Sequence, residues 1–383
     1  MPQALSLYIH WPFCLSKCPY CDFNSHVREH IDHQAWLAGY LKELRFYAGT
    51  LPHQTIKSIF FGGGTPSLMD PKIVEIILNE VTQLWSLPKD LEITLEANPQ
   101  TVEIGKFKDF HAAGINRVSL GIQSLDDTEL KFLGRLHDAT QAMKAITVAR
   151  QVFMRYSLDF IYALPGQSPK KWQASLAQIA PLLQGHISAY QLTIEPGTAF
   201  HTLHQRGEWT LPDEEISAQL YEMTRDVLGQ HGFQAYEISN YARTGGKSQH
   251  NLTYWRYQDY LGIGPGAHGR LTKQGQKYAT YNHKAPEVWL EKVGQSGFAT
   301  KKTEVLSSTE KAKEMLMMGL RLEEGVQLER FRKETGHHLE QFCVPESLAS
   351  LKQEGLIELD TQVLRATQQG RQRLNAVLPY MLP

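Results

Sequence analysis

The chain has 383 residues, of which 42% are apolar, and its 39 Lys and Arg residues are balanced by 40 Asp and Glu residues. This apolar content is too high for a disordered chain, and the length admits one large barrel with an appended domain. The near-neutral balance excludes the global basic field that attracts nucleic acid, so we expect no nucleic-acid partner. No apolar run approaches the roughly 20 residues that span a bilayer.

The N-terminus and the cysteines indicate a cellular compartment. The first ten residues carry no basic region and no small-residue cleavage site, so we expect no export signal and a cytoplasmic location. Three of the four cysteines, Cys14, Cys18 and Cys21, lie within eight residues, and the fourth is Cys343. A disulfide framework would spread its pairs, so this spacing predicts a metal site. Cys343 has no other cysteine or histidine cluster around it and is interpreted as a small apolar residue.

Short β-rich runs alternate with amphipathic helices along the first 240 residues. The expected strands are 5–10, 58–61, 91–95, 117–122, 157–163, 187–194 and 234–238. The expected helices are 32–48, 70–84, one that ends at Gly114, 126–133, 140–152, 168–183 and 214–230. Repeated βα units predict parallel strands with outer helices, and their spacing favours an α/β fold with a whole or partial TIM-like barrel. An open doubly wound sheet is the alternative, and both place functional residues at the C-terminal ends of strands.

The sequence predicts three parts. These are a barrel over residues 1–240, a loop-rich segment over 241–307 and a C-terminal helical domain over 308–383. The last part contains the pattern of three helices and a hairpin, which resembles a winged helix. Winged helices often bind DNA, but the near-neutral charge favours a packing role here.

The cysteine cluster supplies three thiolates on a short loop after the first strand. Cys14, Cys18 and Cys21 would hold three irons of a 4Fe-4S cubane and leave the fourth iron with an open coordination site. A structural zinc ion takes four closed ligands, and no second cysteine pair lies nearby. The alternative is a zinc loop that His10 or His26 completes.

The Cys-x3-Cys-x2-Cys spacing after a first strand resembles the signature of the radical S-adenosylmethionine (SAM) superfamily. In that family the amino and carboxylate groups of SAM chelate the open iron. The reduced cluster then cleaves SAM to methionine and a 5′-deoxyadenosyl radical. The resemblance implies a 4Fe-4S cluster held by the three cysteines, bound SAM, and an electron donor for the cluster.

The resemblance also implies where SAM binds. Gly62-Gly63-Gly64-Thr65-Pro66 resembles the segment that binds the SAM amino group, since glycine allows close backbone approach. Arg135 suits a bidentate pair with the SAM carboxylate, and Asp159, inside an apolar run, needs a partner such as the ribose diol. For each polar candidate the alternative is an ordinary ion pair or a helix cap, and Tyr20 could serve packing alone. The expected SAM contacts are Tyr8, Tyr20, Gly63, Gly64, Thr65, Glu96, Gln123, Arg135 and Asp159.

Longer segments resemble one branch of the superfamily, which contains the oxygen-independent coproporphyrinogen III oxidases (HemN) and heme chaperones. The likeness rests on the run from Tyr8 to Phe23 and on Phe-Gly-Gly-Gly-Thr-Pro-Ser, Glu-Ala-Asn-Pro, Gly-Ile-Gln-Ser and Asp-Phe-Ile-Tyr-Ala-Leu-Pro-Gly, and it covers nearly the whole chain. The cysteine pattern of the oxidases is CxxxCxxCxC, with a fourth cysteine two residues after the third. In this chain Phe23 stands at the position of that fourth cysteine. They also carry an N-terminal extension, whereas 13 residues precede Cys14. Both departures disfavour the oxidase.

The segment from His250 to Trp255 fits an HNxxYW pattern that resembles the heme-binding motif of the chaperones. A neutral imidazole is a good axial ligand for heme iron, and the adjacent aromatic residues would cover a porphyrin face. The alternative is a histidine that caps a loop beside core aromatics. We expect His250 to bind heme, and His268, in the following glycine-rich stretch, is a further candidate.

The sequence thus predicts a heme chaperone that binds heme, a 4Fe-4S cluster and SAM, and passes heme to acceptor apoproteins, which could be membrane-associated. The alternative is an oxygen-independent coproporphyrinogen III oxidase, in which the radical abstracts a propionate hydrogen before CO2 is lost. The cofactor site is the same in both, so the cluster does not decide whether the chain is an enzyme. We expect no oxidase activity and assign no catalytic residue.

Overall fold

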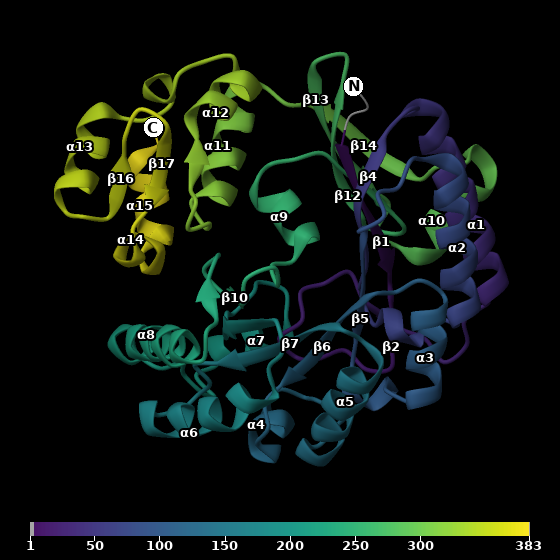
Figure 1. Ribbon diagram of the computed structural model, residues 1–383, viewed down its shortest axis with the longest axis horizontal. Helices are drawn as coiled ribbons and strands as arrows, with labels where there is room; N and C mark the ends of the chain where they lie inside the picture. Colours follow the sequence, from purple (N-terminus) through teal and green to yellow (C-terminus); the bar gives the residue numbers. More distant parts are fainter. Residues whose placement is uncertain (1–3, 383) are drawn as a thin grey trace.

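The computed structural model describes residues 4–382. Its main feature is a 12-stranded sheet in the order β14-β13-β12-β11-β1-β4-β5-β6-β7-β8-β10-β9. The order runs from one edge to the other without closing, so the sheet is a partial barrel, as the sequence predicted. Figure 1 shows the curved sheet with helices along its outer side.

Seven neighbouring strands of this sheet are parallel. They are β11 (Tyr260–Ile263), β1 (Ala4–Trp11), β4 (Thr55–Gly63), β5 (Glu92–Ala97), β6 (Arg117–Gln123), β7 (Arg155–Tyr162) and β8 (His186–Gln191). Helices follow or precede them as α1 (His33–Thr50), α2 (Pro71–Leu84), α3 (Ile104–Ala112), α4 (Asp127–Phe132), α5 (Ala139–Val152), α6 (Pro169–Ile179), α7 (Ala199–Gln205) and α8 (Glu214–Gln230). The six strands expected before residue 200 are all present.

Local sequence explains the positions of these elements. Asp70 caps α2 and accepts a hydrogen bond from the Lys72 amide, with Pro71 at the first helical position. Asp138 forms a capping box with Gln141 at the start of α5. One set of alternate side chains on the parallel strands is apolar and packs beneath the helices, where Leu7 and Ile59 are fully buried. The other set includes polar side chains such as Ser119 and Asp159, which line the inside of the barrel.

The segment 241–307 differs from the loop-rich expectation. It contains α9 (Gln249–Trp255), α10 (Pro286–Ser296) and the strands β11, β12 (His268–Lys273), β13 (Gln276–Asn282) and β14 (Thr300–Val305). β11 pairs in parallel with β1, and β12 to β14 continue the sheet as an antiparallel meander. At the other edge lie the short antiparallel strands β10 (Asn240–Ala242) and β9 (Gln234–Ala235). The meander was missed because its polar side chains hide the alternation of a strand.

The C-terminal part has its own apolar core. It comprises α11 (Ser308–Gly319), α12 (Leu328–Thr335), α13 (Pro345–Gln353), α14 (Gln368–Gln372), α15 (Leu374–Met381) and a sheet of β15 (Val326–Gln327), β17 (Val363–Ala366) and β16 (Ile357–Leu359). Cys343 is buried in this core, as expected. Figure 1 shows this domain beside the open side of the barrel, in yellow-green to yellow.

Ion pairs join the C-terminal domain to the rest. Arg270 of β12 forms a bidentate pair with Glu314 of α11, at 2.7 and 2.9 Å. Arg256 pairs with Glu324 in the same way, and the Arg321 Nε donates to the Glu237 carboxylate at 2.7 Å. No helix among residues 4–382 is long and apolar enough to cross a membrane.

Candidate functional site

The three clustered cysteines lie at the C-terminal end of β1. Cys14 belongs to the short strand β2 (Phe13–Cys14), which pairs with β3 (His26–Val27), and Cys18 and Cys21 follow in a loop. All three thiols are partly exposed and free of disulfides. Burial raises the pKa of the Cys14 and Cys21 thiols, so a bound metal would be needed to favour the thiolates there.

Each cysteine sulfur has a polar neighbour. The Thr65 hydroxyl donates to the Cys14 Sγ at 3.3 Å, and the Arg135 guanidinium donates to the Cys18 Sγ at 3.3 Å. The Cys21 Sγ lies 3.9 Å from the Ser25 hydroxyl. Donors of this kind stabilise negative sulfur, so the donor set fits an iron-sulfur cluster.

The zinc alternative is not supported. Within residues 4–382, no group of three or more Cys, His, Asp or Glu side chains surrounds a single ion position, whereas a zinc site requires such convergence. His10 has both ring nitrogens occupied, by the Tyr8 hydroxyl at 3.0 Å and the Asn24 carbonyl at 2.8 Å. Thiolates that bind three separate irons of a cubane do not have to converge on one point.

The glycine segment lies against the cluster loop. A Cβ at Gly64 would lie 2.6 Å from the Phe13 carbonyl oxygen, and a Cβ at Gly63, where φ is +112°, would lie 2.5 Å from the His10 ring. The Gly64 and Thr65 amides donate to the carbonyls of Trp11 and Phe13. Glycine is therefore required here for close packing of two backbone segments as well as for access to a ligand.

Glu96 is the penultimate residue of β5 and lies beside this segment. Its carboxylate accepts the Gly63 amide at 3.1 Å, which is its one hydrogen bond in the described part of the chain. Burial and the nearby Asp159 carboxylate raise the pKa of Glu96 to about 8. A half-buried carboxyl group that lines a cavity and has spare acceptor capacity fits a cationic ligand, because a positive charge would restore the ionised form.

Asp159 of β7 lies inside the barrel. It accepts hydrogen bonds from Ser119 at 2.8 Å and Ser157 at 3.2 Å, and burial raises its pKa. A cavity of about 220 Å³ brings it together with Glu96 and Tyr8. The carboxyl groups and hydroxyls in this cavity suit hydrogen bonding to a polar ligand such as a ribose.

Arg135 and Tyr20 connect the cluster loop to the barrel. The Arg135 guanidinium donates to the Cys18 sulfur, to the Tyr20 hydroxyl at 3.4 Å, to the Asn98 amide oxygen at 2.6 Å and to the Gly121 carbonyl at 3.1 Å. Only its Nε lacks a partner. A bidentate pair with a SAM carboxylate, as the sequence suggested, does not fit this arrangement because both terminal nitrogens are occupied.

Gln123 ends β6 in an unusual backbone conformation. Its φ is +69°, and the pairing of β6 with β7 is irregular at this point. A non-glycine residue in this region costs about 1–3 kcal/mol and is common at ligand sites. Its side chain lies next to Gly121, where a Cβ would meet the Gln123 Nε2 at 2.9 Å.

Asn98 was not singled out from the sequence, although it lies in the segment Glu-Ala-Asn-Pro. Its amide nitrogen donates to the Thr65 hydroxyl at 3.0 Å, and its oxygen accepts from Arg135. It therefore links the hydrogen bond on Cys14 to the one on Cys18. A polar side chain immediately after a buried strand is the signal that indicates it.

A larger cavity of about 680 Å³ opens between the barrel and the C-terminal domain. It joins Tyr8, Gly63 and Glu96 to Phe23 of the cysteine loop. The rest of its wall includes Asn251, Tyr254, Trp255, Tyr257, Tyr260, His268, Met317 and Met318. Three expected SAM contacts, Tyr8, Gly63 and Glu96, thus share one cavity with the HNxxYW segment. The other six do not line it: Tyr20, Gly64, Thr65, Gln123, Arg135 and Asp159.

Of the four residues that define the HNxxYW pattern, only His250 does not line the cavity. It is 0% exposed, and both ring nitrogens have protein partners, Ser58 at 2.8 Å and Tyr254 at 2.7 Å. Because Ser58 donates its own proton to Ser6, it accepts from the His250 Nδ1, and Nε2 accepts from the Tyr254 hydroxyl. In this arrangement neither ring nitrogen is free to bind iron, so heme ligation by His250 would require it to give up one of these hydrogen bonds.

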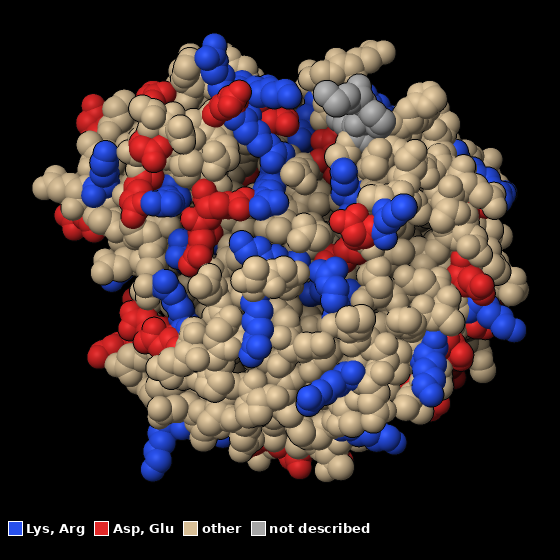
Figure 2. Space-filling model, viewed as in Figure 1, with Lys and Arg blue, Asp and Glu red and all other residues tan. Residues whose placement is uncertain are grey.

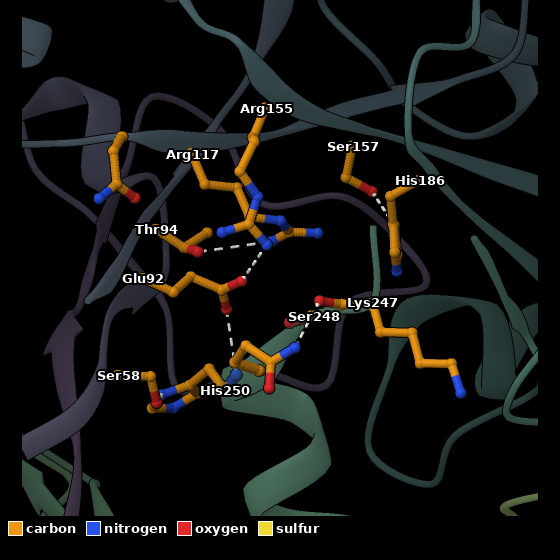
Figure 3. A network of polar contacts seen from close by, with 12 residues as sticks. Ser58, Glu92, Thr94, Arg117, Arg155, Ser157, His186, Lys247, Ser248 and His250 are labelled. Atoms are coloured by element: carbon orange, nitrogen blue, oxygen red, sulfur yellow. Dashed lines mark hydrogen bonds and ion pairs between the residues drawn. The ribbon is translucent and has the colours of Figure 1, made fainter. Parts of the chain in front are cut away.

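His250 instead belongs to a buried polar network. Its amide donates to Glu92, whose carboxylate also accepts from Arg155 at 2.6 Å, as Figure 3 shows. Burial and the Arg117 charge lower the pKa of His250 to about 3, so the imidazole is neutral. The network fixes the start of α9 against β4 and β5 and thereby positions Tyr254 in the cavity wall.

Two family models match the chain. The Radical SAM superfamily model matches residues 8–179, and the HemN C-terminal domain model matches residues 306–373. The chain is also similar in fold to coproporphyrinogen III oxidase (HemN) from Escherichia coli, with a TM-score of 0.82, 21% identity, and coverage of 99% of this chain and 90% of the oxidase.

Full-length relatives are more similar in sequence. The chain is 38% identical to Radical S-adenosyl methionine domain-containing protein 1, mitochondrial, of Bos taurus, over 99% of this chain and 88% of that protein. It is 37% identical to the protein named heme chaperone HemW of Haemophilus influenzae, over 100% of this chain and 99% of that protein. The Escherichia coli protein of the same name is 36% identical, over 99% and 98%.

Proposed function

Because this chain belongs to the radical SAM superfamily and, within it, to the family of the heme chaperone HemW, we propose that it binds heme and passes it to acceptor apoproteins. The observation that carries the proposal is the 680 Å³ cavity with several aromatic side chains in its wall. Its volume lies in the range of cavities that enclose small molecules and cofactors. Its aromatic faces suit a flat, apolar macrocycle.

The cysteine loop has Phe23 where the oxidase-type pattern has a fourth cysteine, which favours a chaperone over an oxidase. Phe23 stands two residues after Cys21, is 57% exposed and lines the cavity. An exposed phenylalanine at a cavity mouth is costly in water unless it meets an apolar partner. In this position it would pack on the edge of a porphyrin.

The residues also fit the cofactors that the family implies. Cys14, Cys18 and Cys21 would hold the 4Fe-4S cluster, and Thr65 and Arg135 would donate hydrogen bonds to its thiolates. We propose that SAM contacts Glu96 and the Gly63 backbone. The remaining proposed contacts are Tyr8, Tyr20, Gly64, Thr65, Gln123, Arg135 through Nε, and Asp159. When bound, the reduced cluster supplies an electron to SAM, which requires an external electron donor.

We further propose a cytoplasmic location and no nucleic-acid partner. Figure 2 shows Lys and Arg residues interspersed with Asp and Glu residues on the visible face. Such a mixed surface does not attract a polyanion strongly.

One anaerobic preparation tests the proposal. Reconstituted protein is given heme and an apo-acceptor hemoprotein in one assay, and coproporphyrinogen III with SAM and a reductant in a parallel assay. We expect stoichiometric heme binding and transfer, with no protoporphyrinogen IX. Formation of protoporphyrinogen IX, or failure to bind heme, would overturn the proposal.

The oxidase is the second candidate because the fold resembles HemN over 99% of this chain. The same cavity would accept coproporphyrinogen, and the same cofactors would be needed. A Phe23→Cys variant, which restores the oxidase-type cysteine, is the informative control in the parallel assay. We expect it to remain inactive as an oxidase, since the substitution changes one residue of the cavity wall and leaves the others as they are.

A further inference from the structure

His268 differs from every other histidine of the site in having free ring nitrogens. It begins β12 and lines the 680 Å³ cavity together with one other histidine, His10. His10 has two hydrogen-bond partners, but within residues 4–382 no hydrogen bond involves the His268 imidazole. Its ring packs edge-on against Tyr281, its cross-strand partner, with centroids 4.8 Å apart. That contact orients the ring and leaves its nitrogens unoccupied.

The surroundings of His268 favour the neutral form. Partial burial and the positive charges of Arg270 and Lys284 lower the pKa of the imidazole, which favours its neutral form. A neutral imidazole with an open lone pair is the form that ligates heme iron.

The same cavity also contains side chains that suit the second axial position and the propionates of a heme. Met317 of α11 is 51% exposed and lines the cavity from the C-terminal domain. Thioethers serve as second axial ligands of heme iron. Lys284 lines the cavity, is exposed, and takes part in no ion pair within the described part of the chain. Its ammonium group is free to meet a propionate, whereas Arg270 is held by Glu314.

We propose that His268 is the residue through which the barrel ligates heme iron, with Met317 contacting the same heme from the C-terminal domain. This inference rests on the proposed function, because it requires that the chain binds heme. It assigns His250 a different role: His250 positions Tyr254 in the cavity wall and does not touch the iron.

The test is a heme titration of the wild type and of His268→Ala, His268→Gln and Met317→Ala. A matched control is His111→Ala on α3, because His111 is exposed and outside the cavity. We expect the His268 variants to bind heme at least roughly tenfold more weakly, since even loss of a partner of a metal ligand typically costs 10- to 100-fold. Their Soret band should shift, and free imidazole should restore the wild-type spectrum in His268→Ala. Circular dichroism verifies that each variant is folded.

The outcomes separate the two proposals. If the wild type and His111→Ala bind heme and His268→Ala shows the same affinity and the same Soret band, His268 is not the ligand, and the proposed function stands. If the wild type binds no heme, both proposals fail. If Met317→Ala leaves the ferric and ferrous spectra unchanged, the contact from the C-terminal domain is refuted.

Discussion

Replacement of His250 by alanine provides a strong test of its structural role. The substitution removes a side chain that is 0% exposed and two hydrogen bonds of 2.8 and 2.7 Å. The Tyr254 hydroxyl loses its acceptor, and each buried polar group left unpaired costs about 1–3 kcal/mol. The lost packing adds to this, since truncation of large buried side chains costs about 2–5 kcal/mol. The contributions overlap, so we expect a total of about 3–5 kcal/mol.

Thermal unfolding of the apoprotein measures this cost. At roughly 2–4 °C per kcal/mol for a chain of about 200 residues, and less for a longer one, the melting temperature should fall by on the order of 5–10 °C. His250→Asn keeps a donor near Ser58 and should lose less. His268→Ala is the control, because an exposed residue without hydrogen bonds changes stability within about 0.5 kcal/mol. The reasoning fails if His250→Ala melts as the wild type does and yet loses the wild-type Soret band.

Three further predictions concern the cofactor site. Gly64→Ala should lower the iron content after reconstitution, because its Cβ would lie 2.6 Å from the Phe13 carbonyl; Gly105→Ala, with no atom within 4 Å, is the control that should retain it. The pKa of Glu96 is about 8 in the apoprotein, so its carboxyl group is mostly protonated at pH 7. A cationic ligand that lowers this pKa should therefore release a proton when it binds at pH 7. The affinity for that ligand should rise with pH up to about 8. Calorimetry of SAM binding in buffers of different ionisation enthalpy measures this release, which Glu96→Gln should abolish; equal enthalpies in the wild type would contradict it. Asn98→Ala should weaken SAM binding at least severalfold, since it frees both Thr65 and Arg135; unchanged affinity would exclude a positioning role.

The sequence predicted the barrel because the signals for its helices and strands lie within short stretches of the chain. Asp70-Pro71 marks a helix start, and the apolar runs of the parallel strands carry their own burial pattern. The antiparallel meander 268–305 lacked such a pattern, because charged residues such as Lys302 and Glu304 occupy its exposed edge. Its place in the sheet depends on contacts between distant residues.

In the site too, features set by neighbouring residues were predictable, whereas features set by distant residues were not. The spacing of Cys14, Cys18 and Cys21 predicted the cluster loop, because all three ligands lie on one short segment. The role of His250 did not follow from its motif, since its partner Ser58 lies 192 residues away. A pattern of residue types does not distinguish a histidine that faces a cavity from one whose nitrogens are both satisfied. The availability of His268 likewise depends on which acceptors the folded chain brings near it.

The 680 Å³ cavity draws its wall from two separately packed units, the barrel and the C-terminal domain, which are joined by pairs such as Arg270 and Glu314. Any molecule that contacts both walls must strengthen their association by the same free energy with which that association strengthens its binding. Conversely, a protein that draws the C-terminal domain towards itself lowers the affinity of the cavity without touching its contents. A partner that separated the two units would in this way exchange tight retention for release.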